Sequence, residues 1–399
     1  MERTQKKHPY LSDDALADLC AWRAEGTEYS DIVELLQKYH DVEVSAESVR
    51  RAWRKYGAVY TTDDPKTTFD TLKSMYQARR ANSGTARENR ALLAALAEQE
   101  DILESIKSVV GKLKPRKFKA PKLVKKPGVT DMTIEALLSD IHFGKKTPDF
   151  NHDVCRARLQ QFTAVFLQEV ARKQQLYNVE KIVLSLNGDI IENSMMHGME
   201  SARSCEFENP EQVRVAIESL WEDVLVPIFS IGIPVEVLAV GGNHDRTDEK
   251  KVMTDPTKNG YCWIIYNVLR MLTERLGYAE QVSWQITEGA YLTYDVYGNK
   301  FLLEHGDVPK SCDRGPLISH HNKRSAQLGV ALSGIRLGHW HTFSCYENGK
   351  VIVNGSVPGG DGYSDTLGFD SRPSQVINFY VRTDNRPSSY YYSFMVQLT

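Results

Sequence analysis

Five apolar runs in this sequence each end at side chains that can bind a metal ion. Carboxylate, imidazole and amide groups are ligands of divalent metals, and the two histidines of GHWH (338–341) would lie on one side of an extended chain. A single ending of this kind is explained by a helix cap, but five in succession predict a metal centre. The side chains at these endings are Asp140, His142, Asp189, Asn243, His244, Asp245, His305, His339 and His341.

The segments that must position these side chains alternate between strand and helix patterns from residue 130 onward. This order is typical of an α/β sheet, in which ligands gather outside the carboxyl ends of the strands, so we expect the five endings to converge. The part from 282 to 399 is richer in strand patterns, which favours a second sheet. We expect strands at 133–140, 181–189, 235–245, 350–356 and 375–381, helices near 153–175, 210–230 and 260–276, and a hairpin turn at 297–299.

Taken in order, the blocks DIH, GD, GNHD, HG and GHWH resemble the pattern of the calcineurin-like metallophosphoesterase superfamily. The resemblance covers 130–399 and implies a two-sheet α/β sandwich of four layers, α/β/β/α, which binds two divalent ions. It also implies that His244 binds no metal and faces the substrate, oriented by Asp245. The ligands that it implies are Asp140, His142 and His341 for one ion, Asn243, His305 and His339 for the other, and Asp189 as the bridge.

The chemistry of phosphoester hydrolysis accounts for these residue types. Two divalent ions ~4 Å apart clamp a phosphoryl group and lower the pKa of a bound water, which becomes a nucleophile near neutral pH. A carboxylate suits the bridge because it has two oxygens and a charge. Imidazole and amide ligands favour Mn, Fe or Zn over Ca or Mg. We favour manganese because nucleases of this superfamily generally use it, which the resemblance implies, and we assign His244 as proton donor to the leaving oxygen.

Two departures from the superfamily pattern narrow the range of substrate classes. Phosphoprotein phosphatases carry GDxVDRG and GNHE, whereas this chain has GDIIENS and GNHD. Both differences favour the double-strand-break-repair exonuclease branch, although no accessory DNA-capping domain is identified after GHWH. Arg246 and Arg203 are candidate phosphate contacts, and we expect His197 to be a surface or packing residue. The sequence therefore predicts a DNA nuclease, without deciding between exonuclease and endonuclease.

Three alternatives to the nuclease remain open at this stage. Two are enzymes, a nucleotide or small-molecule phosphoesterase and a phosphoprotein phosphatase. The third belongs to another class, a DNA-binding factor with a subordinate phosphatase domain.

Residues 10–57 carry the pattern of three short helices, with Ser45 as the cap of the third and Gly57 as its end. A small helical module with a basic third helix resembles the homeodomain-like helix-turn-helix, whose last helix enters the major groove. The alternative is a three-helix module that binds another protein. The basic residues proposed to contact DNA are Arg50, Arg51, Arg54 and Lys55.

The segment 61–128 is polar and helix-prone and ends in a basic stretch. Its helical part, 87–110, could pack on the rest of the chain or form an oligomer through Leu92, Leu96, Ile102, Ile106 and Val109. The stretch 112–128 holds eight Lys and Arg residues, no acid and three prolines. It is either a solvated linker or an arm along a phosphate backbone.

The sequence as a whole argues against a secreted protein, a membrane-spanning protein and a zinc-ribbon protein. The 399 residues have a net charge of −3, which neither favours nor excludes a polyanionic partner. The six cysteines form no C-x-x-C pair, as expected for a reduced compartment without a zinc ribbon. No secretory signal and no long apolar run stand out, so we expect a cytoplasmic protein without a membrane partner.

Overall fold

The computed structural model describes residues 11–60, 86–112, 125–196, 203–248, 254–360, 371–383 and 390–399. The chain forms two compact units, 1–94 and 95–399, and helix α5 (Ala86–Lys112) spans the boundary between them. Most of the basic stretch and His197 lie outside the described residues.

The N-terminal unit has the three expected helices, α1 (Asp13–Ala24), α2 (Tyr29–His40) and α3 (Ala46–Tyr60). Ser45 caps α3 as expected, because its Oγ accepts a hydrogen bond from the Ser48 amide at 3.2 Å. The expected end at Gly57 was wrong, since a glycine lowers helix propensity without ending a helix that its neighbours continue. The core of this unit consists of Ala15, Leu19, Cys20, Ile32, Leu36 and Val49.

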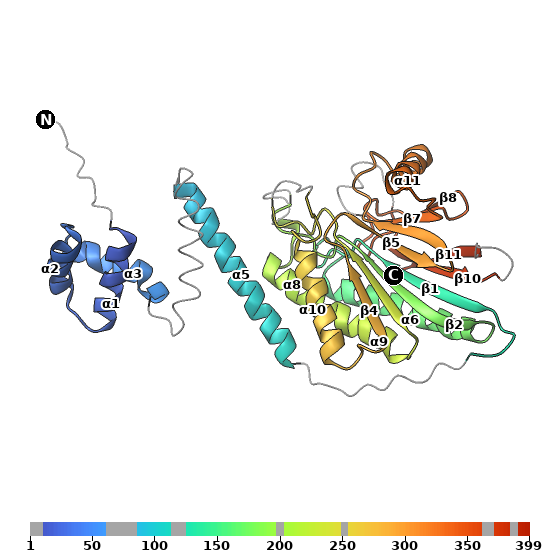
Figure 1. The fold of residues 1–399 in the computed structure, drawn as a ribbon, viewed down its shortest axis with the longest axis horizontal. Coiled ribbons are helices and arrows are strands. Elements are labelled where there is room, and N and C mark those ends of the chain that lie inside the picture. The colour runs from blue at the N-terminus through green and yellow to red at the C-terminus, as the bar shows by residue number, and fades with distance from the viewer. Residues whose placement is uncertain are drawn as a thin grey trace. The chain divides into compact units, whose positions relative to one another are not determined.

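The second unit contains two β-sheets (Figure 1). In the six-stranded sheet the order is β11-β10-β1-β2-β3-β4, in which β1 to β4 are parallel, β10 pairs antiparallel with β1, and β11 pairs antiparallel with β10. Its strands are β1 (Asp131–Leu138), β2 (Asn178–Asn187), β3 (Val235–Val240), β4 (Val282–Ile286), β10 (Ser374–Val381) and β11 (Tyr390–Gln397). The second sheet, in the order β5-β6-β7-β9-β8, contains β5 (Tyr291–Val296), β6 (Asn299–Glu304), β7 (Gly334–Leu337), β8 (Ser344–Tyr346) and β9 (Val351–Val353).

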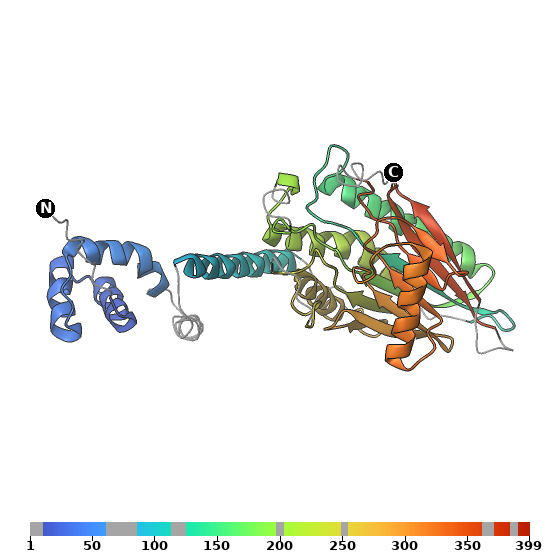
Figure 2. The ribbon, with the colours of Figure 1, turned by 90° about the horizontal axis from the view of Figure 1, so that it is seen from above.

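Helices cover the outer face of each sheet, which gives four layers (Figure 2). The inner faces pack together through an apolar layer that includes Leu137, Val183, Phe301 and Leu303. The expected α/β fold, a two-sheet sandwich, is therefore confirmed. The helices on the first sheet are α6 (His152–Gln174), α8 (Asn209–Ser219), a π-helical turn η1 (Leu220–Leu225), α9 (Val226–Ser230) and α10 (Tyr261–Arg275), and α11 (Arg314–Leu328) covers the second.

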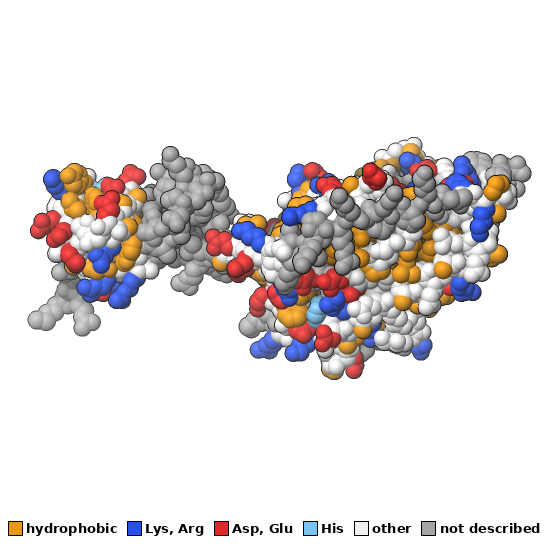
Figure 3. All heavy atoms as spheres, turned by 90° about the horizontal axis from the view of Figure 1, so that it is seen from below, with side chains coloured by type: hydrophobic (Ala, Val, Ile, Leu, Met, Phe, Trp, Pro, Cys, Tyr) orange, Lys and Arg blue, Asp and Glu red, His pale blue; other side chains and the backbone are white. Residues whose placement is uncertain are grey.

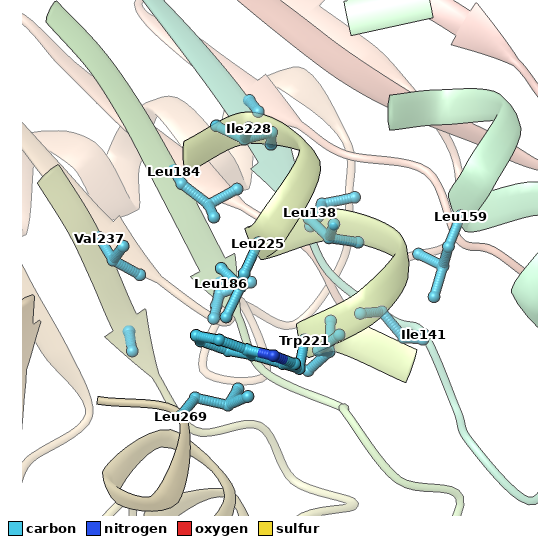
Figure 4. Close-up of a cluster of buried hydrophobic side chains, with 14 of the residues drawn as sticks. Leu138, Ile141, Leu159, Leu184, Leu186, Trp221, Leu225, Ile228, Val237 and Leu269 are labelled. Carbon is cyan, nitrogen blue, oxygen red and sulfur yellow. The ribbon is translucent and has the colours of Figure 1, made fainter. Parts of the chain in front are cut away.

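The largest apolar core lies between the first sheet and its helices. Figure 4 shows Trp221 of η1 among leucines of the sheet and of α10, Leu186 and Leu269. Helix α5 joins this core, because Ile102 and Val109 are buried in it. Part of the α5 face that we considered for oligomer formation is therefore buried within the chain. Oligomer formation through this helix stays a prediction. Among the described residues, no helix is long and apolar enough to cross a membrane.

Candidate metal centre

The five expected endings meet at one edge of the sandwich. Each follows directly after a strand, β1, β2, β3, β6 or β7, because the parallel strands of both sheets end on the same side. The side chains form two groups, and within each group the ligand atoms lie within 4.8 Å of one another: Asp140, His142 and His341 in one and Asp189, His305 and His339 in the other. A third group with the same spacing joins His142 and His244 to Glu192.

The first group holds two imidazoles and a carboxylate. His341 Nε2 lies 3.3 Å from Asp140 Oδ1 and 3.2 Å from His142 Nε2. His142 Nδ1 lies 2.7 Å from the carboxylate of Glu192, while Nε2 faces the group. A ring nitrogen anchored in this way, with its second nitrogen aimed at other acceptors, is the arrangement of a metal ligand.

The second group is also built around a histidine whose Nδ1 contacts a partner outside the group. His305 Nδ1 donates to the Asn187 carbonyl at 2.8 Å, so Nε2 faces two oxygens, Asp189 Oδ2 and Asn243 Oδ1, each at 3.1 Å. His339 stands beside this ring with centroids 5.3 Å apart. Three acceptors directed at one point repel one another unless a cation lies among them or the ring is protonated. The donor set therefore fits a divalent metal with nitrogen and oxygen ligands.

Asp189 lies close to both groups. Its Oδ2 is 3.1 Å from His305 Nε2 and 3.9 Å from His142 Nε2. Burial alone would raise the pKa of Asp189, but the charges of His305 and His244 outweigh it and hold the pKa well below its usual range. A carboxylate that stays ionised between two histidine groups is suited to bridge two cations.

The backbone at this edge is strained. Asp140, His142, Asp189, His339 and His341 all have φ between 50° and 69°, in the left-handed region. Each such residue costs about 1–3 kcal/mol, and clusters of them are typical of ligand and active sites. Glycines permit the close approach, because a Cβ at Gly242 would lie 2.2 Å from Asp189 Oδ1 and one at Gly338 would lie 2.5 Å from Asp140 Oδ2. The second glycine of GGN and the glycine of GHWH are therefore needed, because a side chain would not fit at either position.

Glu192 is a residue of the centre that the sequence reading missed. It is buried, and its carboxylate contacts His142 Nδ1 at 2.7 Å and Lys145 Nζ at 3.3 Å. Burial would raise its pKa, but the charge of His142 and the hydrogen bond with it lower the pKa to about 2. A signal was present, because Glu192 stands where GDxVDRG has its second acid.

We expect Glu192→Gln to lower metal affinity roughly 10- to 100-fold, the usual cost of losing an outer partner of a metal ligand. The amide keeps the shape of the side chain but removes the negative charge that faces His142 Nδ1. Isothermal titration with Mn²⁺ measures the change, with Glu222→Gln as a control that alters an acid paired with Arg156 outside the centre. Wild-type affinity in Glu192→Gln would show that His142 needs no anchor.

His244 lies beside the first group without joining the two ligand sets. Its Nδ1 donates to the Glu192 carbonyl at 2.7 Å, and its ring stands 4.7 Å from that of His142, centroid to centroid. The Asp245 carboxylate accepts hydrogen bonds from the amides of Gly242 at 2.8 Å and Ile190 at 2.9 Å. Asp245 therefore ties two site loops together, and its expected role in orienting His244 stays a prediction.

The two arginines expected to contact a phosphate lie on segments beside the centre. Arg246 is held by backbone carbonyls, with Nε donating to Asp248 at 3.0 Å and Nη2 to Met196 at 3.4 Å. Arg203 is exposed, on a segment that pairs with the loop after His142 through the Lys146 amide and the Ser204 carbonyl at 2.7 Å. Both positions leave the expected phosphate contact a prediction.

The basic residues expected to bind DNA lie on α3. Arg50, Arg51 and Arg54 are exposed, and the Lys55 side chain is outside the described part. Arg50 pairs with Glu47 at 3.0 Å and lies over the Tyr29 ring. Of the basic stretch, Lys125 pairs with Asp131 and Glu180 and Lys126 donates to the Gln174 carbonyl, so both help to fasten the start of the first sheet.

Comparisons with known proteins give no family model that matches and no match among curated proteins. Among solved structures, Vps29 from Entamoeba histolytica complexed with zinc is 14% identical, with a TM-score of 0.28 over 66% of this chain and 98% of that one. A predicted phosphoesterase from Streptococcus pneumoniae gives the same four values. A hypothetical protein from Pyrococcus horikoshii is 11% identical, with a TM-score of 0.33 over 67% of this chain and 89% of that one. Overlaps of this size carry no functional weight.

Proposed function

We propose that this protein is a metal-dependent phosphoesterase that hydrolyses phosphodiester bonds of DNA. The observation that carries the proposal is the pair of ligand groups that meet at Asp189, each with an imidazole anchored through Nδ1 and directed through Nε2. Such a pair fits two divalent ions rather than one. The calcineurin-like sequence pattern supports the same chemistry.

In this proposal the ligands keep the sets implied by the sequence pattern. Asp189 would bridge the two ions, and manganese is the favoured metal, with iron or zinc as alternatives. When bound, the ions polarise the phosphoryl group and lower the pKa of a water. The sets are Asp140, His142 and His341 for one ion and Asn243, His305 and His339 for the other.

His244 donates the proton that the leaving oxygen needs. Because its Nδ1 proton is used on the Glu192 carbonyl, Nε2 is the nitrogen that would carry a proton to the substrate. The His244 amide donates to Asp189 Oδ1 at 2.7 Å, which places the ring next to the bridging carboxylate. Its side chain is 16% exposed, so a substrate can reach it from the solvent.

DNA is the proposed substrate because of the N-terminal unit. Three arginines, Arg50, Arg51 and Arg54, line its exposed third helix, as in modules that place such a helix in the major groove. On the face drawn in Figure 3, basic side chains gather at the lower edge of this unit. On the same face of the second unit, basic and acidic side chains are interspersed rather than gathered in a basic track, and a nucleotide phosphoesterase is the second candidate.

The decisive experiment compares several substrates on the full-length protein. Metal is removed with a chelator and Mn²⁺, Fe²⁺ or Zn²⁺ is added back, and cleavage of linear, nicked and single-stranded DNA is measured beside cleavage of bis(p-nitrophenyl) phosphate and of free nucleotides. We expect metal-dependent cleavage of DNA and of the nitrophenyl diester. Cleavage of the nitrophenyl diester and of free nucleotides, with DNA left intact, would favour the second candidate. No metal-dependent cleavage of any substrate would refute the phosphoesterase.

We expect Arg50→Ala combined with Arg54→Ala to weaken DNA binding and to make its salt dependence shallower, because fewer phosphates are neutralised. Each lost contact should reduce the salt slope by about 1. Fluorescence anisotropy over a salt series measures both, with Lys38→Ala on α2 as a control for loss of an exposed charge. A loss confined to one DNA sequence indicates base contacts, and unchanged affinity favours a unit that binds protein.

A further inference from the structure

We infer that helix α5 carries a positioning residue for the proposed proton donor, because its Glu98 fixes the loop of His244 through a series of buried and partly buried hydrogen bonds. The inference rests on the proposed function, in which His244 donates a proton. The series leads from α5 through α10 and α8 to the segment after β2. It lies wholly in the unit formed by 95–399.

The first link joins α5 to α10. The Tyr261 hydroxyl donates to Glu98 Oε1 at 2.5 Å and accepts from Asn209 Nδ2 at 3.1 Å. Tyr261 is only 3% exposed and begins α10, so its hydroxyl reaches no alternative partner without moving the helix. The buried Ile102 and Val109 hold α5 on the unit beside this link.

The second link joins α8 to the segment after β2. Asn209 Nδ2 lies 3.2 Å from Asn193 Oδ1, and Asn209 Oδ1 accepts from the Ser194 amide at 2.9 Å. Both asparagines are 2% exposed, and Asn193 has a φ of 68°. A buried and satisfied network of this kind is rigid, and it fixes the orientation of the Asn193 amide.

The third link is the clamp on the His244 loop. Asn193 Nδ2 donates to the carbonyls of His244 at 2.8 Å and Arg246 at 2.7 Å. The neighbouring Glu192 carbonyl holds the His244 ring, and the Tyr261 amide donates to the Asp245 carbonyl at 2.6 Å. The main chain on both sides of Asp245 and the ring of His244 therefore depend on partners that Tyr261 and Asn193 hold in place.

Glu98, Tyr261 and Asn209 act through other residues and are positioning residues. A shift of the His244 ring should matter only where the leaving oxygen needs a proton. A structural defect would instead affect all substrates alike. The two outcomes are separated by a thymidine dinucleotide, whose leaving group is an alkoxide, and bis(p-nitrophenyl) phosphate, whose phenolate leaves without help.

The test uses Tyr261→Phe in the full-length protein with both substrates. We expect kcat on the dinucleotide to fall roughly tenfold, within the range for misplaced catalytic groups, while kcat on the nitrophenyl diester and metal content stay at wild-type values. Tyr294→Phe is the matched control, since Tyr294 is also a buried tyrosine that donates to a carboxylate, Glu135, at 2.9 Å. It should leave the ratio of the two rates unchanged.

A second pair of variants tests Glu98, which lies at the partly exposed end of the same network. Glu98→Gln keeps an oxygen that accepts the Tyr261 hydroxyl and should retain the wild-type ratio of rates, whereas Glu98→Ala should lower it. An unchanged ratio in both Tyr261→Phe and Glu98→Ala, with His244→Ala still changing it, overturns this inference alone. Absence of any metal-dependent diester cleavage by the wild type overturns the proposed function and this inference together.

Discussion

Asp189→Ala should abolish diester hydrolysis and remove most of the bound metal while the protein stays folded. Asp189 Oδ2 is the atom close to histidines of both groups, 3.1 Å from His305 and 3.9 Å from His142. Loss of an outer partner of a ligand costs roughly 10- to 100-fold in metal affinity or activity. Loss of a ligand shared by two ions should cost more than that.

Three measurements on Asp189→Ala separate metal loss from unfolding. Metal content is measured by elemental analysis, and the melting temperature is measured with and without Mn²⁺. Wild-type protein should melt at a higher temperature with metal because the ion binds only the folded state, and the variant should lose this shift. Circular dichroism reports the fold.

Asp223→Ala is the control for Asp189→Ala, since it removes a buried carboxylate paired with Arg156 outside the centre. It should lower the melting temperature yet retain the shift produced by Mn²⁺. Two ions still bound to an inactive Asp189→Ala protein would contradict the bridging role.

The convergence of the ligands could be predicted because it follows from topology. Parallel strands expose their carboxyl ends at one edge, and each of the five blocks follows such a strand. The turn at Tyr297 and Gly298 could also be predicted, since both residues have positive φ as a two-residue hairpin turn requires. This turn depends only on residues that are adjacent in the sequence.

The contacts that could not be predicted from the sequence join residues that are far apart in the chain, or involve a side chain that has several possible partners. Asp245 stands next to His244 but its carboxylate is used on the amides of Gly242 and Ile190. The backbone carbonyl of Glu192, three residues beyond Asp189, contacts the His244 ring, and no pattern in the sequence indicates this pairing.

The sequence pattern also leaves open how the helix before the basic stretch packs. The helix at 87–110 was expected to pack on the rest of the chain or to form an oligomer, and its Ile102 and Val109 lie in the main core. A shortened protein that begins near 129 would therefore lose buried apolar surface. One that begins near 95 keeps it.

His244→Ala should retain both metals and lose cleavage of DNA far more than cleavage of a nitrophenyl diester. His244 is not among the two ligand groups that meet at Asp189, and its Nδ1 is fixed on the Glu192 carbonyl at 2.7 Å. A deoxyribose oxygen is a poor leaving group, so a positioned acid should contribute roughly 10²- to 10⁴-fold to the rate. A nitrophenolate leaves readily without one.

Rates on both substrates are compared with metal content measured on the same samples. His321→Ala serves as control, because His321 is a buried histidine of α11 that donates to the Leu332 carbonyl at 3.1 Å, away from the two ligand groups. An equal fall on both substrates would reject the proton-donor role and leave His244 as a phosphate contact. Loss of one metal would place His244 among the ligands, in the group that it forms with His142 and Glu192. A selective fall on DNA with both metals retained is the result that only a proton donor held beside the two ions explains.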